Sequence, residues 1–280
     1  MAQKLKIVNC SVSSDSKEIN SSTDNETGEV AVSLGEQEPK EKVKKRNTKN
    51  RRIFRTECIS ITLSKICKMK REEILNDLGW RYATKRFNRE ASIDEKDYQA
   101  VKEAIRLAPT SYGLQPFKVI EIEDRETLTQ LQAAGYGQKQ IVDASRLMAI
   151  ASLKSFDNDL IDRYINLSME TRGLTENEVS GYSNFMKGVF SQWSEEAKKS
   201  WSEKQAYLAL GFGMLAAAEL NIDTCALEGI DVQHVNKILQ LEDSDYHVSV
   251  LLALGKRAEE DENQHLKKVR LETSVLFETI

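Results

Sequence analysis

Apolar residues recur at helical spacing in several stretches of the chain, and the clearest stretch follows a capping sequence. Ser92-Ile93-Asp94-Glu95 has the pattern of a capping box, in which the serine caps the helix and the glutamate reaches back. Tyr98, Val101 and Ile105 follow at the period of a helix with one apolar face. We expect this helix to end before Pro109, because the residue ahead of a proline disfavours helical geometry.

The same criterion predicts further helices along the chain. They cover residues 70–78, 158–170, 175–187 and 204–220. The last of these is the most apolar, and it contains Gly211 and Gly213. Each glycine costs roughly 1 kcal/mol relative to alanine in a helix. We therefore expect another helix or a flat ligand to pack closely at these positions.

Short apolar runs predict strands between the helices. They cover residues 117–122, 147–153, 222–227 and 246–254. The tail, residues 273–279, alternates between apolar and polar residues and is predicted to be an edge strand. Helices and strands follow each other without regular β-α-β repetition, which favours an α+β fold.

Composition indicates a soluble globular protein and excludes several classes. Of the 280 residues, 40% are hydrophobic and 30% charged. No run approaches the roughly 18 apolar residues that span a bilayer, so no membrane partner is expected. Met1–Ser11 lacks the features of a secretory signal. The four cysteines are scattered and form no CxxC pair, so we expect free thiols and a cytoplasmic location.

The first 68 residues differ in character from the rest of the chain. They hold 14 Lys and Arg against 9 Asp and Glu, whereas the remainder holds 26 against 35. Their first forty residues are polar and lack an apolar period, so they should not pack a core. We therefore expect residues 1–68 to be a disordered or non-family extension, with Met69 close to the natural start, and residues 69–280 to form the folded domain.

A basic run, Lys40–Arg55, lies in this extension. Basic runs can bind nucleic acid or anionic lipid. Phe54 is its only aromatic residue, so a stacking platform for single strands is not supported. Since the chain also has a net charge of −4, we expect a solvated arm and no nucleic-acid partner.

Side-chain catalysis has little support in the sequence. His234, His247 and His265 are widely spaced and have no neighbour at metal-ligand spacing, so no metal site is expected. The chain contains no GxSxG, HExxH or Walker A motif. We therefore expect no catalytic side chain and a cofactor that carries the chemistry.

Several basic and polar clusters follow one another along the chain. They are Arg81-Tyr82-Ala83-Thr84-Lys85-Arg86-Phe87, the turn Ala108–Phe117, Gln138-Lys139-Gln140 before Asp143-Ala144-Ser145, Lys204-Gln205-Ala206-Tyr207-Leu208, Glu228-Gly229-Ile230-Asp231 and Lys268-Val269-Arg270. Their order over Met69–Ile280 resembles the nitroreductase family. The resemblance implies a mostly antiparallel sheet flanked by helices. It also implies an interlocked homodimer in which a C-terminal strand crosses to the partner and FMN lies in the interface.

The resemblance assigns the flavin contacts to particular residues. Arg81, Lys268 and Arg270 would clamp the FMN phosphate, since forked donors and fixed positive charge suit a dianion. Lys85 and Gln140 would face the N1 and O2 side of the ring, where negative charge collects on reduction. The remaining cofactor contacts would come from Tyr82, Ala83, Leu227, the backbone of Glu228 and Gly229 near N5, and Thr110, Ser111 and Gly113 of the other subunit.

Aromatic residues are the substrate candidates that the resemblance implies. Tyr112 and one of Phe185 and Phe190 would stack over the open face of the flavin. Two positions depart from the family pattern: Ala83, where many members have serine, and Gly113, where asparagine is common. These departures bear on the detailed flavin contacts and on the substrate range.

The activity implied by the resemblance is a two-step exchange. NAD(P)H would give a hydride to FMN and leave, and an electron-poor acceptor would then take the electrons at the same face. Nitroaromatics, quinones and dihydropteridines are the acceptors that the family suggests. The alternatives are a flavin reductase or dehalogenase-like member of the same fold, or a flavin-binding module without turnover.

Overall fold

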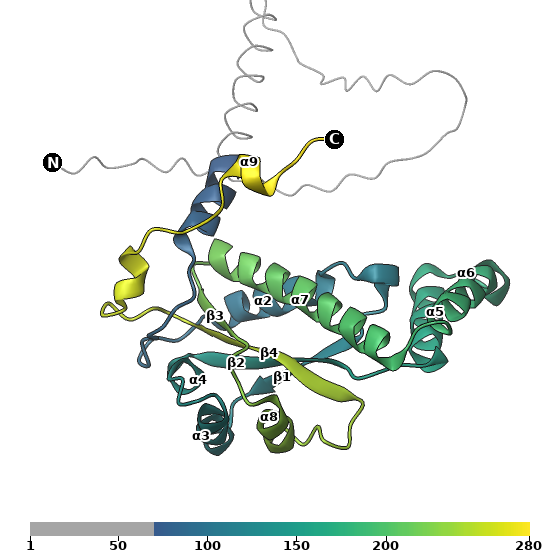
Figure 1. Ribbon diagram of the computed structural model, residues 1–280, viewed down its shortest axis with the longest axis horizontal. Coiled ribbons are helices and arrows are strands. Elements are labelled where there is room, and N and C mark those ends of the chain that lie inside the picture. The colour runs from purple at the N-terminus through teal and green to yellow at the C-terminus, as the bar shows by residue number, and fades with distance from the viewer. Residues whose placement is uncertain (1–69) are drawn as a thin grey trace, which may run out of the picture. The chain divides into compact units, whose positions relative to one another are not determined.

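The described domain is built around a four-stranded antiparallel sheet, shown in Figure 1. The computed structural model describes residues 70–280, so the predictions for residues 1–69, including the basic run, lie outside the described residues. The strand order is β1-β2-β4-β3, and β1 is therefore an edge strand of this sheet. The strands are β1 (Phe117–Ile122), β2 (Arg146–Leu153), β3 (Asp223–Leu227) and β4 (Tyr246–Gly255).

Helices cover both faces of the sheet (Figure 1). One face carries α2 (Glu95–Leu107) and α7 (Glu195–Glu219), and the other carries α3 (Arg125–Ala134), α4 (Gln140–Asp143) and α8 (Val232–Ile238). Because side chains alternate along a strand, each face of the sheet has its own apolar core. Met148, Ile150 and Leu252 lie in the core under α2 and α7, whereas Leu147 and Leu251 lie in the core on the other face.

The remaining described helices do not belong to the two layers that cover the sheet. They are a helix over residues 70–80, η1 (Ser111–Gly113), α5 (Asn158–Arg172), α6 (Glu176–Phe190), η2 (Glu262–His265) and α9 (Thr273–Leu276). Helices α5 and α6 form a hairpin with its own core, to which Phe156, Phe190 and Trp201 contribute. The predicted α+β class is confirmed.

Two predicted helix starts were wrong. Asp94 caps α2 instead of Ser92, because its carboxylate accepts a hydrogen bond from the Lys96 backbone N–H at 2.8 Å. Helix α7 begins nine residues before the predicted start at Lys204, since Ser194 caps it by accepting from the Ala197 N–H at 3.2 Å. The polar composition of its first turns concealed this part of the helix.

The predicted edge strand in the tail was also wrong. Thr273–Leu276 forms a short helix, closed by hydrogen bonds from the Leu276 N–H to the Glu272 carbonyl and from the Phe277 N–H to the Thr273 carbonyl. A strand needs a neighbouring strand to satisfy its backbone groups. Within the described part of the chain, the tail has no such neighbour. Local hydrogen bonds therefore take the place of a ladder.

One of the two helix glycines is explained by close packing. A Cβ at Gly213 would lie 2.7 Å from Cγ1 of Ile105, so the glycine lets α2 pack directly against α7. At Gly211, in contrast, a Cβ would meet no atom of the described residues within 4 Å. The prediction of a close neighbour is confirmed at Gly213, and Gly211 faces open space.

Candidate functional site

The segment after the first helix is held in place by one buried carboxylate. Asp261 Oδ2 accepts hydrogen bonds from the Tyr82 hydroxyl at 2.9 Å, the Lys85 N–H at 2.7 Å and the Arg86 N–H at 3.1 Å. Its Oδ1 accepts from the backbone and the side chain of Asn263 at 3.1 and 2.8 Å. Residues 82–86 and 261–263 therefore form one structural unit, although they are far apart in sequence.

This arrangement also fixes the charge of the carboxyl group. Burial by itself would raise the pKa of Asp261, but the hydrogen bonds from Asn263, Lys85, Arg86 and Tyr82 outweigh burial and hold that pKa well below its usual value. The group is therefore an acceptor for all these donors at neutral pH.

A second carboxylate joins the same segment to the sheet. Asp223, at the start of β3, accepts hydrogen bonds from the Arg257 backbone N–H at 2.8 Å and from its Nε at 2.7 Å. The guanidinium of Arg257 lies 4.2 Å from the ring centre of Trp80 and 4.6 Å from that of Tyr82. The Thr84 N–H donates to the Thr224 carbonyl at 3.2 Å. Residues 80–84 are thus fixed against β3.

These contacts bring together a cluster of four cations, namely Arg81, Arg257, Lys268 and Arg270. The Lys268 ammonium donates to the Arg81 carbonyl. Burial and the charge of Arg270 lower the pKa of Arg81. Burial and the charges of Arg81, Arg270 and Arg257 lower the pKa of Lys268. Like charges gathered in this way are stabilised by a bound anion.

Arg81 also carries a donor with no acceptor. Its Nε is buried and has no hydrogen-bond partner among the described residues. A buried donor without a partner costs free energy, typically about 1–3 kcal/mol. A phosphate would satisfy both the unpaired donor and the excess positive charge, so the residues present fit the phosphate of a nucleotide cofactor.

Next to this cluster, β3 brings three predicted cofactor residues together around Cys225. Burial raises the pKa of the Cys225 thiol, whereas the charges of Lys85 and Arg81 and a hydrogen bond from Gln140 act in the opposite direction. Gln140 is itself buried, at the first turn of α4. Arg81, Lys85 and Gln140 therefore all act on the thiol of Cys225.

The backbone after β3 is accessible on one side. Leu227 is buried at the end of the strand. At Gly229, a Cβ would meet only Nε2 of Gln138, at 3.9 Å, and the same amide donates to the Gly229 carbonyl at 2.8 Å. Burial and the Glu228 carboxylate raise the pKa of Tyr207 on α7. The Glu228-Gly229 backbone is thus held in place and open to a close approach.

The turn at residues 109–116 is anchored to α7 by a buried amide. Gln205 Oε1 accepts from the Ser111 N–H at 2.8 Å, and Gln205 Nε2 donates to the Trp201 carbonyl at 3.1 Å. Thr110 Oγ1 accepts from the Gln115 N–H at 3.2 Å. None of the hydrogen bonds or ion pairs made by the described residues joins this turn to the cation cluster.

The turn also has an unusual backbone. The φ angles of Tyr112, Gly113 and Gln115 are +58°, +74° and +44°. Non-glycine residues seldom adopt positive φ, and such strain gathers at functional sites. This observation makes the turn a candidate ligand-contacting segment.

Tyr112 lies beside both of the predicted stacking partners, which differ in accessibility. Its ring centre is 5.3 Å from that of Phe190 and 6.5 Å from that of Phe185. Phe190 is buried against Phe156 and Trp201, whereas 55% of Phe185 is exposed. Phe185 is therefore the one of the two that can touch a ligand, whereas Phe190 packs against Tyr112 from the core.

Sequence reasoning missed three residues that build this site: Asp261, Arg257 and Gln205. Asp261 and Arg257 lie in ordinary charged sequence, and their partners are distant in the chain. Gln205 falls within a motif that carries the resemblance, but the motif does not tell which side chain anchors the turn. No pattern available in one sequence distinguishes these residues from surface polar residues.

Metal sites and membrane-spanning helices were also sought among the described residues. Within residues 70–280, no group of His, Cys, Asp and Glu has an arrangement that could hold a metal ion. In the same range, no helix combines the length and apolar character that a bilayer-spanning segment needs.

One of the three histidines has a structural partner. His247 is buried, and its Nε2 lies 2.7 Å from a carboxylate oxygen of Glu203.

Comparisons with known proteins agree with this geometry. The model of the Nitroreductase family matches residues 78–256, more than half of the chain. A Staphylococcus haemolyticus protein, whose name gives NAD(P)H nitroreductase as a provisional function, is 33% identical over 207 residues, covering 69% of this chain and 92% of the relative.

Solved structures show the same fold. A Bacillus subtilis protein, titled with nitroreductase as a provisional name, has a TM-score of 0.66 at 22% identity and covers 75% of this chain and 99% of its own. A similarly named protein from Exiguobacterium sibiricum, solved in complex with FMN, has a TM-score of 0.63 at 22% identity and covers 75% of this chain and 96% of its own. The chain therefore belongs to the nitroreductase family and is an oxidoreductase.

Proposed function

We propose that this chain binds FMN and uses it to pass electrons from NAD(P)H to electron-poor acceptors such as nitroaromatics, quinones or dihydropteridines. The observation that carries the proposal is the cluster of Arg81, Arg257, Lys268 and Arg270 with its unpaired Arg81 donor. Support also comes from the Exiguobacterium sibiricum relative, whose structure contains FMN, and from the Staphylococcus haemolyticus relative, whose name includes NAD(P)H.

Different residues of the chain would hold the phosphate and the ring of FMN. Arg81, Lys268 and Arg270 bind the phosphate. Lys85 and Gln140 lie at the ring edge, where a cation and an amide favour the negatively charged reduced form. The open backbone at Gly229 permits a close approach. When bound, FMN supplies the ring that accepts a hydride and returns electrons to the second substrate.

The remaining contacts require a second subunit. As the resemblance to the family implies, Thr110, Ser111 and Gly113 serve the site of the partner in the proposed homodimer. Helix α7 presents an apolar face for this partner, with Leu208, Phe212 and Leu215 each at least 40% exposed. Exposed apolar patches of this kind mark protein interfaces.

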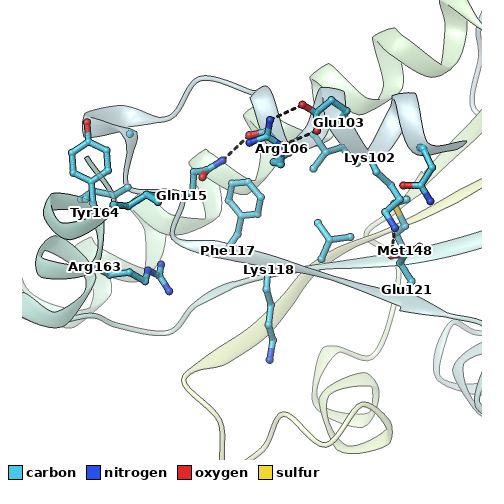
Figure 2. Close-up of a pocket in the computed structure, with 16 residues that line it drawn as sticks. Lys102, Glu103, Arg106, Gln115, Phe117, Lys118, Glu121, Met148, Arg163 and Tyr164 are labelled. Carbon is cyan, nitrogen blue, oxygen red and sulfur yellow. Dashed lines mark hydrogen bonds and ion pairs between the residues drawn. The ribbon is translucent and has the colours of Figure 1, made fainter. Parts of the chain in front are cut away.

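The C-terminal segment is the second element that we assign to the dimer. Val275, Leu276 and Phe277 are 63–70% exposed. A cavity of about 630 Å³ lies beside the open edge of β1 (Figure 2). Its walls come from α2, the 109–116 turn, β1, β2 and α5, and include Lys118. This cavity offers the partner's tail a place beside the unpaired edge of β1.

Mixing the purified protein with NADPH or NADH without oxygen tests the electron-transfer function. We expect the flavin absorbance near 450 nm to bleach, and to recover when a quinone or nitroarene is added, since the acceptor re-oxidises the ring. Recovery only with free FMN as acceptor would indicate a flavin reductase. Bound flavin that stays yellow with both nucleotides would show a binding module without turnover and would overturn the proposal.

A charge on the exposed face of α7 tests the dimer. Phe212→Glu should convert a particle of two 31.8 kDa chains into one, because a carboxylate buried in an apolar interface without a partner is costly. The control is Val232→Glu on α8, a residue with similar exposure on the other face of the sheet. Light scattering after gel filtration gives the mass, and an unchanged dimer in the Phe212 variant would place the interface elsewhere.

A further inference from the structure

The side-chain amide of Gln138 joins two loops that are far apart in the chain. Its Nε2 donates to the Gly229 carbonyl at 2.8 Å, across 91 positions of the sequence. Gln138 lies in the segment between α3 and α4, and Gly229 lies in the segment between β3 and α8, all of which are labelled in Figure 1. The bond therefore fixes the backbone after β3 to the end of α3.

The turn that carries Gln138 is itself closely held. The N–H groups of Gly135, Tyr136 and Gly137 donate to carbonyls of the last turn of α3 at 2.8, 3.2 and 2.9 Å, and the Gln138 N–H donates to the Gly135 carbonyl at 3.1 Å. The φ angles of Tyr136 and Gly137 are +54° and +76°. Tyr136 is 75% exposed, so packing of its ring does not explain this conformation. Such backbone strain gathers at functional sites.

The bond from Gln138 also decides where the backbone of Gly229 points. The Ile230 N–H donates to the Glu228 carbonyl at 2.8 Å, which closes a three-residue turn around Gly229. A trans peptide unit is planar, and its C=O and N–H point in opposite directions. Since the Glu228 carbonyl is directed at Ile230, the N–H of Gly229 is directed away from the turn.

The carbonyls of this turn have partners, but its first two N–H groups do not. Within residues 70–280, no hydrogen bond is donated by the backbone N–H of Glu228 or of Gly229, which both lie beyond the end of β3. Both residues are exposed. The turn thus presents two backbone donors, in directions fixed by Gln138, to an acceptor atom of a ligand.

We propose that Gln138 is a positioning residue of the cofactor site, whose amide locks residues 228–230 and so directs the Gly229 N–H at the FMN ring. The inference rests on the proposed function, in which this backbone lies near flavin N5. In oxidised flavin N5 has a lone pair that accepts a hydrogen bond, whereas in reduced flavin it carries a hydrogen of its own. A fixed N–H at this place therefore binds the oxidised ring more strongly than the reduced one.

Gln138→Met tests this role, because methionine keeps the length of the side chain and removes the donor. The dissociation constant of oxidised FMN should rise roughly three- to tenfold, the effect of losing one hydrogen bond. The affinity for reduced FMN should stay unchanged. The midpoint potential of the bound flavin should then rise by about 15–30 mV, which is the same factor converted for a two-electron couple. Fluorescence titration and spectroelectrochemistry measure the two quantities.

Two further variants separate the hydrogen bond from packing and from general effects of the substitution. Gln138→Ala should shift the potential as much as Gln138→Met does, because both lack the amide. Gln130→Met is the matched control on α3, since the Gln130 amide is exposed and bonds at 3.4 Å to Glu126 of the same helix. It should keep the wild-type potential. A shift in the alanine variant without one in Gln138→Met, or equal shifts in Gln130→Met and Gln138→Met, would overturn the inference.

Urea denaturation of the FMN-loaded protein distinguishes positioning from a purely structural role. A lower urea midpoint in Gln138→Met together with an unchanged potential and FMN affinity would show that the amide only stabilises the fold, and would overturn the inference. A potential shift at an urea midpoint close to that of Gln130→Met would support it, because the effect is then confined to the cofactor.

These outcomes also separate the inference from the function on which it rests. A protein that holds FMN at a potential set by Gln138, but is not reduced by NAD(P)H, contradicts the proposed function alone. A protein that NAD(P)H reduces and that keeps the same potential in all variants contradicts the inference alone. A chain that holds no FMN overturns both.

Discussion

Arg81→Met should weaken FMN binding roughly ten- to hundredfold, the effect of losing hydrogen bonds from a charged donor to a phosphate. The physical reason lies in the cation cluster, where Arg81 has a buried Nε without a partner and where neighbouring charges lower its pKa. Methionine keeps most of the apolar stem and removes the donors. Titration of free FMN, followed by the quenching of its fluorescence, gives the dissociation constant.

The control for this substitution is an arginine of the same segment. Arg86 is exposed, and its backbone N–H, not its guanidinium, bonds to Asp261. Arg86→Met should therefore leave the FMN affinity within about twofold of the wild-type value, as surface substitutions usually do. Equal losses in both variants would mean that general positive charge, and not the assigned clamp, attracts the cofactor.

Asp261→Ala should lower the free energy of unfolding by about 3 kcal/mol, because it leaves several partly buried N–H and O–H donors without an acceptor. Urea denaturation at pH 7 measures this loss. Asp261→Asn should also destabilise the protein, since its amide directs a donor toward other donors. Glu259→Gln, an exposed neighbour, is the control and should change the stability little.

The same carboxylate gives the stability a dependence on acid. The pKa of Asp261 is lower in the folded protein than its ordinary value, so its stabilising effect is fully present above about pH 4 and is lost as the pH falls toward the folded-state pKa. The difference in stability between the wild type and Asp261→Asn should therefore shrink between pH 7 and pH 3. A difference that is constant with pH would contradict this role.

Much of the fold could be predicted because its signals are local. The buried strand β2 contains the apolar run Leu147–Ala151, and Tyr98, Val101 and Ile105 mark the buried face of α2. The apolar pattern did not reveal helices that are short or polar. Helices α3 and α8 were not predicted, since ten and seven residues carry few apolar positions. The prediction of a strand in the tail was wrong because a strand needs a neighbouring strand, which the sequence does not specify.

The candidate site shows a different limit. Its residues were proposed from a resemblance, and the fold brings Arg81, Lys85 and Gln140 together around Cys225. The residues that support them could not be proposed, because their contacts are long-range. Asp261 bonds to Tyr82 across 179 positions of the chain, and Gln205 bonds to Ser111 across 94. A single sequence contains no signal for such pairs.

The proposed sharing of FMN contacts between the cation cluster of one chain and the 109–116 turn of another has a thermodynamic consequence. A cofactor that touches the cluster of one chain and the turn of another binds to the assembled pair and not to the single chain, so binding and assembly share one free energy. Dilution should then release FMN, and added FMN should hold the pair together. The fraction of chains that hold FMN would therefore rise with the concentration of the protein itself.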